Sequence, residues 1–238
     1  MSSKFNDLSK MKTISVIGTV GIPASYGGFE SLVENLVLNA GEGINYNVYC
    51  SSSHYSSKLK KHNGATLTYI PLKANGVQSI IYDIVALILS IFRRDSAVLI
   101  LGVSGCLFLP FFKLMSPKCK VITNIDGFEW KREKWGRFAR FILRKSEAAA
   151  VRFSDIVVTD NQAISDYVQQ CYGIESKVIA YGGDHSIPYT VTYSLLKTET
   201  RKDYYLSLCR IEPENNVQMI LSAFAKSGKP LKFIGNWD

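Results

Sequence analysis

Short apolar runs rich in β-branched residues alternate with longer amphipathic stretches along most of the chain. The apolar runs predict strands at residues 13–18, 45–51, 66–70, 97–102, 120–125, 155–160 and 177–181. Helical spacing predicts helices at residues 28–40, 77–92, 107–115, 133–152 and 162–171. Strands that alternate with helices in this way form a parallel sheet with helices on both faces. The sequence therefore predicts an α/β, Rossmann-like fold.

The alternation stops at residues 182–202, which contain Gly, Pro, Ser and Thr without a sustained period. It restarts with a strand at 204–209, a helix at 216–228 and a strand at 231–235, the first βαβ unit of a second domain. Two or three strands with one helix do not close a core by themselves, so we expect this second domain to be truncated. The expected parts are a first domain over 11–183, a linker over 184–202 and a second domain over 203–238.

The segment from Ile80 to Phe92 comes closest to a membrane span. It is shorter than the ~18–20 apolar residues that cross a bilayer, and Asp83 interrupts it. We therefore predict a buried helix there.

The composition adds one feature to this picture, a positive net charge. The chain of 238 residues is 47% hydrophobic and 20% charged, as is usual for a soluble globular protein, but its formal net charge is +8. This charge favours an anionic partner, such as nucleic acid, acidic lipid or a phosphorylated substrate. The five cysteines lack CxxC spacing and the three histidines form no ligand pair, so we expect reduced thiols, no metal site and a cytosolic location.

A glycine-rich loop, GTVGIPASYGGFE at residues 18–30, joins the first predicted strand to the first predicted helix. The free N–H groups and the dipole of a helix N-terminus favour an anion, and Gly27 and Gly28 let a ligand approach the backbone. The spacing matches neither the GxGxxG fingerprint nor a Walker loop, which disfavours a dinucleotide dehydrogenase or an NTPase. The alternative is a tight turn that only needs positive φ angles.

A second candidate segment, NIDGFEWKREKW at residues 124–135, follows a central predicted strand. Ligands of open α/β sheets bind beyond the carboxyl ends of the strands. Asp126 and Glu129 are carboxylates that can accept a proton from a sugar hydroxyl. In the alternative interpretation, Asp126 caps a turn and Glu129 pairs with Lys131 or Arg132.

The helix predicted next is basic and aromatic. Trp135, Phe138, Phe141 and Ile142 can share one face of it. This combination is typical of a helix that lies on an anionic membrane surface. Alternatively, the aromatic side chains face the protein core and the charges are solvated. The candidate membrane-facing residues are Trp135, Arg137, Phe138, Arg140 and Arg144.

Arg210 follows the strand at 204–209 and precedes the helix that begins near Asn216. An arginine at this position can clamp a diphosphate. The alternative is a surface ion pair with Glu212 or Glu214.

Five motifs together resemble, in the same order, the bacterial rhamnosyltransferase branch of glycosyltransferase family 4, which has the GT-B fold. They are GTVGIPASYGGFESLVENL, IDGFEWKREKW, VTDNQAISDYV, IAYGGD and LCRIEPENNVQMILSAF. The resemblance covers Met11 to Asp238 and implies that the first domain holds an acceptor and the second a nucleoside-diphosphate sugar, with no metal or other cofactor. Many relatives have a lysine where this chain has Glu214, Asn215 and Asn216, which leaves one fewer cation for the diphosphate.

The resemblance also implies roles for individual residues. Asp126 and Glu129 are expected to be catalytic, with Asp126 standing where many relatives have a histidine beside the transferred sugar. Residues expected near the donor diphosphate are Gly21, Gly27, Gly28 and Arg210. Residues expected to bind the acceptor are Tyr26, Trp130, Lys131 and Arg132. The paired glutamates that grip the nucleotide sugar in this family would lie beyond Asp238, so we expect the chain to bind donor weakly.

The implied function is transfer of a hexose, with rhamnose expected, to a polyprenyl-diphosphate-linked glycan in cell-surface polysaccharide synthesis. The expected location is cytoplasmic, at the inner face of the plasma membrane. The alternative is a catalytically incomplete fragment that only binds an acceptor or an anionic membrane surface. Nucleic-acid binding rests on net charge alone, because no recognition motif supports it.

Overall fold

The computed structural model describes residues 11–25, 27–133, 135–183 and 203–235. The chain divides into two compact units. The first contains residues 1–131 and 135–181, and the second contains residues 132–134 and 182–238. The predicted linker at 184–202 lies outside the described residues.

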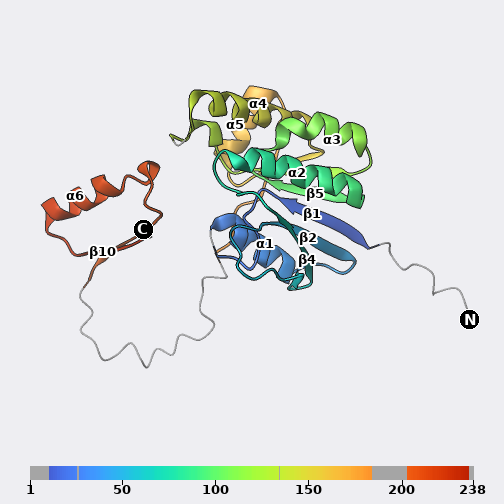
Figure 1. Ribbon diagram of the computed structural model, residues 1–238. Helices are drawn as coiled ribbons and strands as arrows, with labels where there is room; N and C mark the ends of the chain where they lie inside the picture. Colours follow the sequence, from blue (N-terminus) through green and yellow to red (C-terminus); the bar gives the residue numbers. More distant parts are fainter. Residues whose placement is uncertain (1–10, 26, 134, 184–202, 236–238) are drawn as a thin grey trace, which may run out of the picture. The chain divides into compact units, whose positions relative to one another are not determined.

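The first unit is built on an eight-stranded sheet with the order β3-β4-β2-β1-β5-β6-β7-β8 (Figure 1). Every neighbouring pair is parallel except β3 and β4. The strands are β1 (Lys12–Ile17), β2 (Ile44–Ser51), β3 (Lys61–His62), β4 (Ala65–Ile70), β5 (Ala97–Leu101), β6 (Lys120–Ile125), β7 (Ile156–Thr159) and β8 (Lys177–Val178).

Helices cover both faces of this sheet (Figure 1). Because side chains alternate across a strand, adjacent residues of β1 enter separate cores: Val16 packs with Val33 of α1, and Ile17 belongs to the cluster that includes Leu87 of α2. α1 (Gly28–Leu38) covers one face. The other face is covered by α2 (Gln78–Arg93), α3 (Leu109–Met115), α4 (Arg137–Phe153) and α5 (Gln162–Tyr172), with the short helices η1 (Cys106–Phe108) and η2 (Glu129–Lys131) between them.

The predicted α/β class and the parallel sheet covered on both faces are confirmed. The helix predicted over 133–152 begins later, at Arg137, because Gly136 is an extended N-cap with φ −66° and ψ 164°. The strand predicted over 177–181 is reduced to Lys177–Val178, and the two-residue strand β3 was not predicted.

The prediction of a buried helix from Ile80 to Phe92 is correct for only one side of α2. Tyr82, Ala86 and Leu87 are fully buried, whereas Ile81 and Phe92 are 56% and 79% exposed. The sequence could not separate the two sides, because α2 carries apolar residues around its whole circumference. None of the described helices has both the length and the hydropathy of a membrane span.

The second unit contains the predicted βαβ pattern. β9 (Tyr205–Leu208) and β10 (Leu231–Ile234) pair in parallel, and η5 (Pro213–Asn215) and α6 (Val217–Ser227) lie between them in the chain. Among the described residues of this unit, only Val217 is a buried apolar side chain, and Leu206 and Leu208 are exposed. This unit therefore has almost no buried core of its own.

Two glycines near the end of β1 are required by the fold itself. Gly18 has φ +90°, and a Cβ there would lie 2.0 Å from the carbonyl oxygen of Leu101. Gly21 has φ +126°, and a Cβ there would lie 2.6 Å from Cys50 Sγ. The structural explanation of the glycine-rich loop, a turn with positive φ, therefore holds at these two positions.

We expect Gly21→Ala to lower the free energy of unfolding by roughly 3 kcal/mol, because it combines backbone strain with a clash against β2. Urea denaturation measures the loss. Gly64→Ala is the matched control, because Gly64 also has a positive φ but no atom within 4 Å of an added Cβ. That variant should lose only about 1 kcal/mol. Equal losses would mean that close packing against Cys50 is not what Gly21 provides.

Candidate functional site

The loops that follow β1, β5, β6 and β7 leave the same edge of the sheet, because these strands are adjacent and parallel. We call this the strand-end edge and define it by the loops at residues 18–27, 102–105, 126–131 and 160–161. It includes the main part of both segments that the sequence singled out in the first domain. Ligands of open parallel sheets bind at this edge.

The buried carboxylate of Glu30 holds the glycine-rich loop in place. Glu30 is 3% exposed and lies in the first turn of α1. Its Oε1 accepts hydrogen bonds from Thr19 Oγ1 and from the Val20 N–H, both at 2.7 Å. Thr19 Oγ1 in turn accepts the Gly21 N–H at 3.2 Å. The loop conformation is therefore set by contacts within the protein.

Gly27 and Gly28 differ from Gly21 in their backbone geometry. Gly27 is the N-cap of α1 and is extended, with φ −161°. A Cβ on Gly28 would meet no described atom within 4 Å, and neither glycine has a left-handed φ. Packing thus gives a reason for glycine at position 27, where a Cβ would lie 3.3 Å from Glu30 Oε2, but neither packing nor turn geometry explains Gly28. In the described structure α1 has no side-chain cap, so its first N–H groups are suited to an anion.

The ends of β6 and β7 bring two aspartates to the strand-end edge. Ile125 of β6 is in register with Thr159 of β7, and Asp126 and Asp160 are the next residues of the two strands. Asp126 is exposed. Asp160 Oδ1 is buried and has no hydrogen-bond partner among the described residues, and burial raises the pKa of this carboxyl group.

A tyrosine and an asparagine complete this group. The buried Asn124 side chain donates from Nδ2 to the Tyr181 hydroxyl at 3.1 Å. Burial raises the pKa of Tyr181 to about 12, and the charges of Asp160 and Asp126 add to the increase. The arrangement offers one exposed carboxylate as a proton acceptor beside hydroxyl and amide groups that can position a polar substrate.

Sequence reasoning missed Asn124, Asp160 and Tyr181 as site candidates. The signal for Asp160 was present, because it follows a predicted strand just as Asp126 does. Tyr181 is the last residue of the strand predicted at 177–181, but its contact with Asn124 depends on the packing of residues that follow β8.

The prediction that Trp135 faces a membrane is wrong. Trp135 is 4% exposed, and its indole N–H donates to Glu129 Oε1 at 2.9 Å. It precedes α4 and does not share the exposed side of that helix with Phe138. This hydrogen bond also gives Glu129 a positioning role in the loop, so Asp126 is the more accessible of the two predicted catalytic carboxylates.

A second buried carboxylate, Glu147 of α4, ties three aromatic side chains together. Glu147 is 0% exposed. It accepts the Trp130 indole N–H at 3.0 Å and the hydroxyls of Tyr167 and Tyr172 at 2.7 and 2.6 Å. Trp130, a predicted acceptor-binding residue, is thereby fixed to α4 and α5. Lys131 Nζ lies 4.1 Å from the centre of the Phe128 ring beside it, and Lys131 is exposed.

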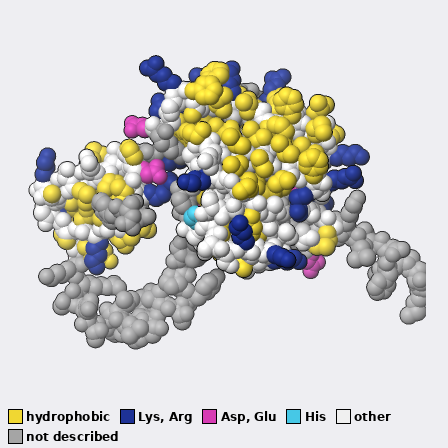
Figure 2. All heavy atoms as spheres, in the orientation of Figure 1, with side chains coloured by type: hydrophobic (Ala, Val, Ile, Leu, Met, Phe, Trp, Pro, Cys, Tyr) yellow, Lys and Arg dark blue, Asp and Glu magenta, His cyan; other side chains and the backbone are white. Residues whose placement is uncertain are grey.

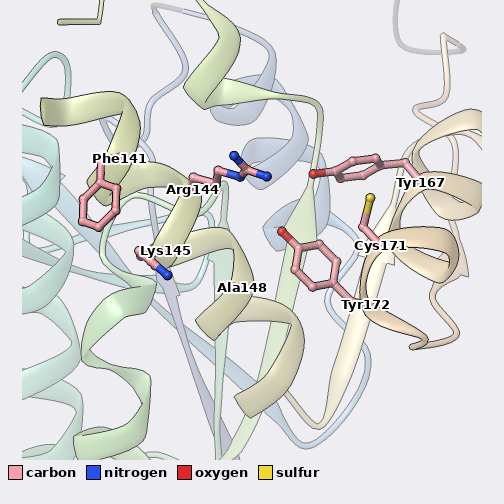
Figure 3. Close-up of a pocket in the computed structure, with 7 residues that line it drawn as sticks. All are labelled: Phe141, Arg144, Lys145, Ala148, Tyr167, Cys171 and Tyr172. Atoms are coloured by element: carbon pink, nitrogen blue, oxygen red, sulfur yellow. The ribbon is translucent and has the colours of Figure 1, made fainter. Parts of the chain in front are cut away.

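A pocket of about 410 Å³ lies between α4 and α5, next to this anchor (Figure 3). Arg144 and Lys145 line it from α4, and Tyr167, Cys171 and Tyr172 line it from α5. Burial, and to a lesser extent the carboxylate of Glu147, raises the pKa of both tyrosines above the ordinary value. The two hydroxyls therefore stay protonated and keep donating to Glu147.

The remaining predicted residues lie as follows. Arg137, Phe138 and Arg144 are exposed on α4, and Arg140 is partly exposed. Arg210 is half exposed and forms an ion pair with Glu212 at 3.1 Å. This is the surface ion pair that the alternative interpretation of Arg210 predicted. Arg132 is partly buried, and Tyr26 lies outside the described residues. Within the described parts of the chain, no three His, Cys, Asp or Glu side chains are grouped as a metal site.

The chain is similar to known proteins in sequence profile and in architecture. The sequence profile described as "Domain of unknown function (DUF1972)" matches residues 11–184. A search of curated protein sequences finds no match.

Solved structures with the same architecture include sucrose-phosphate synthase from Thermosynechococcus elongatus, at 13% identity and a TM-score of 0.72 over 95% of this chain and 63% of that one. UGT89C1 of Arabidopsis thaliana, solved with UDP, matches at 12% identity, a TM-score of 0.55, and 95% and 70% coverage. A putative UDP-N-acetylglucosamine 2-epimerase from Listeria monocytogenes matches at 10% identity, a TM-score of 0.54, and 97% and 63% coverage. These similarities show that the chain has a GT-B fold.

Asp83 of α2 is a buried carboxyl group behind the strand-end edge. A Cβ added to Gly105, in the loop after β5, would lie 2.4 Å from Asp83 Cβ. Burial raises the pKa of Asp83 from 3.8 to about 8, against a smaller opposing effect of the Gly105 N–H. Its Oδ1 has no partner among the described residues. The native protein therefore holds a proton on Asp83 near neutral pH.

We expect Asp83→Asn to flatten the dependence of stability on pH. In the wild type, the native state keeps a proton that the unfolded chain releases, so this contribution to stability is complete below pH 3.8 and is lost progressively as the pH rises from there through about 8. Urea denaturation at a series of pH values measures the slope. Asp166→Asn, at an exposed position of α5, is the control and should keep the wild-type slope. An unchanged slope in Asp83→Asn would contradict the buried proton.

Proposed function

The chain belongs to the family described as Domain of unknown function (DUF1972), and we propose that it serves a GT-B glycosyltransferase that moves a hexose from a nucleoside-diphosphate sugar. The chain spans 63% of the length of the sucrose-phosphate synthase structure, so the activity of a whole enzyme is part of this proposal. Rhamnose as the sugar rests on the sequence resemblance to the rhamnosyltransferase branch of family 4.

The observation that carries the proposal is Gly28 at the start of α1, a helix without a side-chain cap in the described structure. No left-handed backbone and no close neighbour requires glycine at position 28. A diphosphate that contacts the first N–H groups of α1 accounts for the glycine, because a side chain at position 28 would stand between the phosphate and the backbone. The sequence resemblance assigns the diphosphate to the same loop.

The proposed reaction needs one proton acceptor. The acceptor hydroxyl attacks the anomeric carbon of the donor, its proton passes to the carboxylate of Asp126, and the bond from the anomeric carbon to the diphosphate oxygen breaks. The leaving nucleoside diphosphate takes the electron pair, and the N-terminus of α1 stabilises its charge without a resident metal or cofactor. The sequence resemblance assigns a further positive charge for the diphosphate to Arg210.

We further propose that the acceptor is a polyprenyl-diphosphate-linked glycan, bound at the inner face of the plasma membrane during cell-surface polysaccharide synthesis. Trp130 and Lys131 at the strand-end edge suit a phosphorylated acceptor with sugar rings, and Arg132 adds a charge in the role that the resemblance implies. A second candidate function is that of an acceptor- or membrane-binding module without catalysis. It is favoured by the formal net charge of +8, which suits an anionic partner with or without catalysis.

We expect Gly28→Leu to weaken the binding of a nucleoside diphosphate roughly tenfold or more, because the side chain fills the space in front of α1. Calorimetric titration with UDP, GDP and dTDP measures the affinity. Gly136→Leu is the control, because Gly136, the N-cap of α4, likewise lies at a helix start without a left-handed φ and has open space around it. Because weak binding is expected, the proposal fails if the wild type binds none of the three nucleotides even at roughly millimolar concentration, or if both variants bind equally well.

We expect Asp126→Asn to lower kcat/KM for sugar transfer by roughly 10²–10⁴-fold, with the affinity for nucleoside diphosphate unchanged. The assay follows transfer of labelled sugar from nucleoside-diphosphate donors to a lipid-linked acceptor. Asp166→Asn makes the same chemical change at an exposed position of α5 and should leave transfer unaffected. Wild-type rates in Asp126→Asn would remove this residue from the reaction, and nucleotide binding without transfer in the wild type would favour the binding module.

A further inference from the structure

The outer side of α2 is apolar although no part of the described structure covers it. Ile81 and Phe92 are 56% and 79% exposed, and Ile84 and Ile88 between them are partly exposed. These four residues follow helical spacing and form one stripe along α2. A helix on the surface of a globular protein normally has charged or polar residues along this stripe.

α3 extends this exposed apolar surface. Phe111, Leu114 and Met115 are 63%, 77% and 66% exposed, and α3 contacts both α2 and α4. Figure 2 shows hydrophobic side chains in one continuous area over the helices that Figure 1 labels α2, α3 and α4. We call Ile81, Phe92, Phe111, Leu114 and Met115 the apolar face. A large continuous apolar area is uncommon on the surface of a monomeric soluble protein and usually marks an interaction site.

The exposed charges carried by the helices of the apolar face have one sign, and the acidic residue that pairs with α3, Asp155, is bound to both Lys113 and Lys120. The only acidic residues of α2, α3 and α4, all of which are described, are Asp83 and Glu147, and both are buried. The exposed charged residues of these three helices, of the turn after α2 and of the turn after α3 are basic, and they include Arg94, Lys118, Arg137, Arg144 and Lys145. The surface thus combines bulky apolar side chains with positive charge.

We propose that the apolar face docks on an anionic lipid bilayer. Phenylalanine, leucine and methionine side chains enter the boundary between headgroups and acyl chains, and the surrounding arginines and lysines contact acidic headgroups. The sequence suggested a membrane contact for α4 alone, whereas in the structure α2 and α3 carry most of the exposed apolar side chains, and α4 adds charge together with the exposed Phe138 and Phe141. This inference does not depend on the proposed transferase activity.

Charge complementarity favours a bilayer over a second copy of the chain. In a symmetric dimer through this face, the same surface meets itself, so the basic residues of one copy approach those of the other. An acidic bilayer instead offers the opposite charge together with an apolar interior. A bilayer therefore matches both the positive charge and the apolar side chains of this surface.

Sedimentation with vesicles tests the proposal in the absence of any substrate. The protein should bind vesicles of phosphatidylcholine and phosphatidylglycerol in roughly a 3:1 ratio, bind pure phosphatidylcholine weakly, and lose affinity as salt is raised. The double variant Phe92→Gln/Phe111→Gln should reduce the partition coefficient roughly tenfold. Its thermal midpoint should stay unchanged, because both side chains are mainly exposed.

Two control variants separate this surface from general effects. Leu38→Gln/Leu59→Gln changes exposed apolar residues elsewhere on the first unit and should bind as the wild type does. Arg137→Glu/Lys145→Glu should abolish the preference for acidic vesicles, whereas Lys58→Glu/Lys60→Glu changes the net charge equally and should keep it.

The proposal is overturned if the wild type does not bind acidic vesicles, or if Phe92→Gln/Phe111→Gln binds them as tightly as the wild type. A dimer in analytical ultracentrifugation that this double variant dissociates, without vesicle binding, would show that a second copy covers the face. The nucleotide titration uses no vesicles, so the membrane proposal and the nucleotide-binding proposal can fail separately.

Discussion

Parallel pairing of β1 with β5, β5 with β6 and β6 with β7 is the constraint on which the candidate site depends. It sends the loop after each strand to one edge of the sheet, although these loops are far apart in the sequence. The start of α1, the Asp126 segment and Asp160 gather there for this reason. The chemistry of the edge is therefore a consequence of topology, and each loop only has to supply the right side chain at a strand end.

Two buried carboxylates hold loops of the strand-end edge in place. Glu30 holds the glycine-rich loop through Thr19 and Val20, and Glu147 holds the segment after β6 through Trp130. A buried carboxylate is costly unless its oxygens are hydrogen-bonded, so each glutamate strongly favours the loop conformation that supplies its donors. Both loops are thus positioned by contacts within the protein, and in the described structure no side chain caps the start of α1.

Local pattern predicted most of the fold, because period and β-branched content report directly on which residues face a core. The sequence also predicted that Asp126 follows a central strand. It failed at Trp135, since a tryptophan beside basic residues fits a membrane surface and a buried hydrogen bond to Glu129 equally well. It missed Tyr181 because the contact with Asn124 is made by tertiary packing alone.

The outer stripe of α2 shows most clearly what sequence patterns do not resolve. A helix that is apolar all round avoids water equally well inside a protein or against lipid, so its pattern is the same in both cases. The structure separates them, because Phe92 and Phe111 make their main surface available to solvent. Exposed side chains contribute little to folding, so the fold does not require phenylalanine at either position. The proposed contact with a bilayer accounts for their apolar character, and the basic exposed residues of α2, α3 and α4 fit the acidic headgroups of such a bilayer.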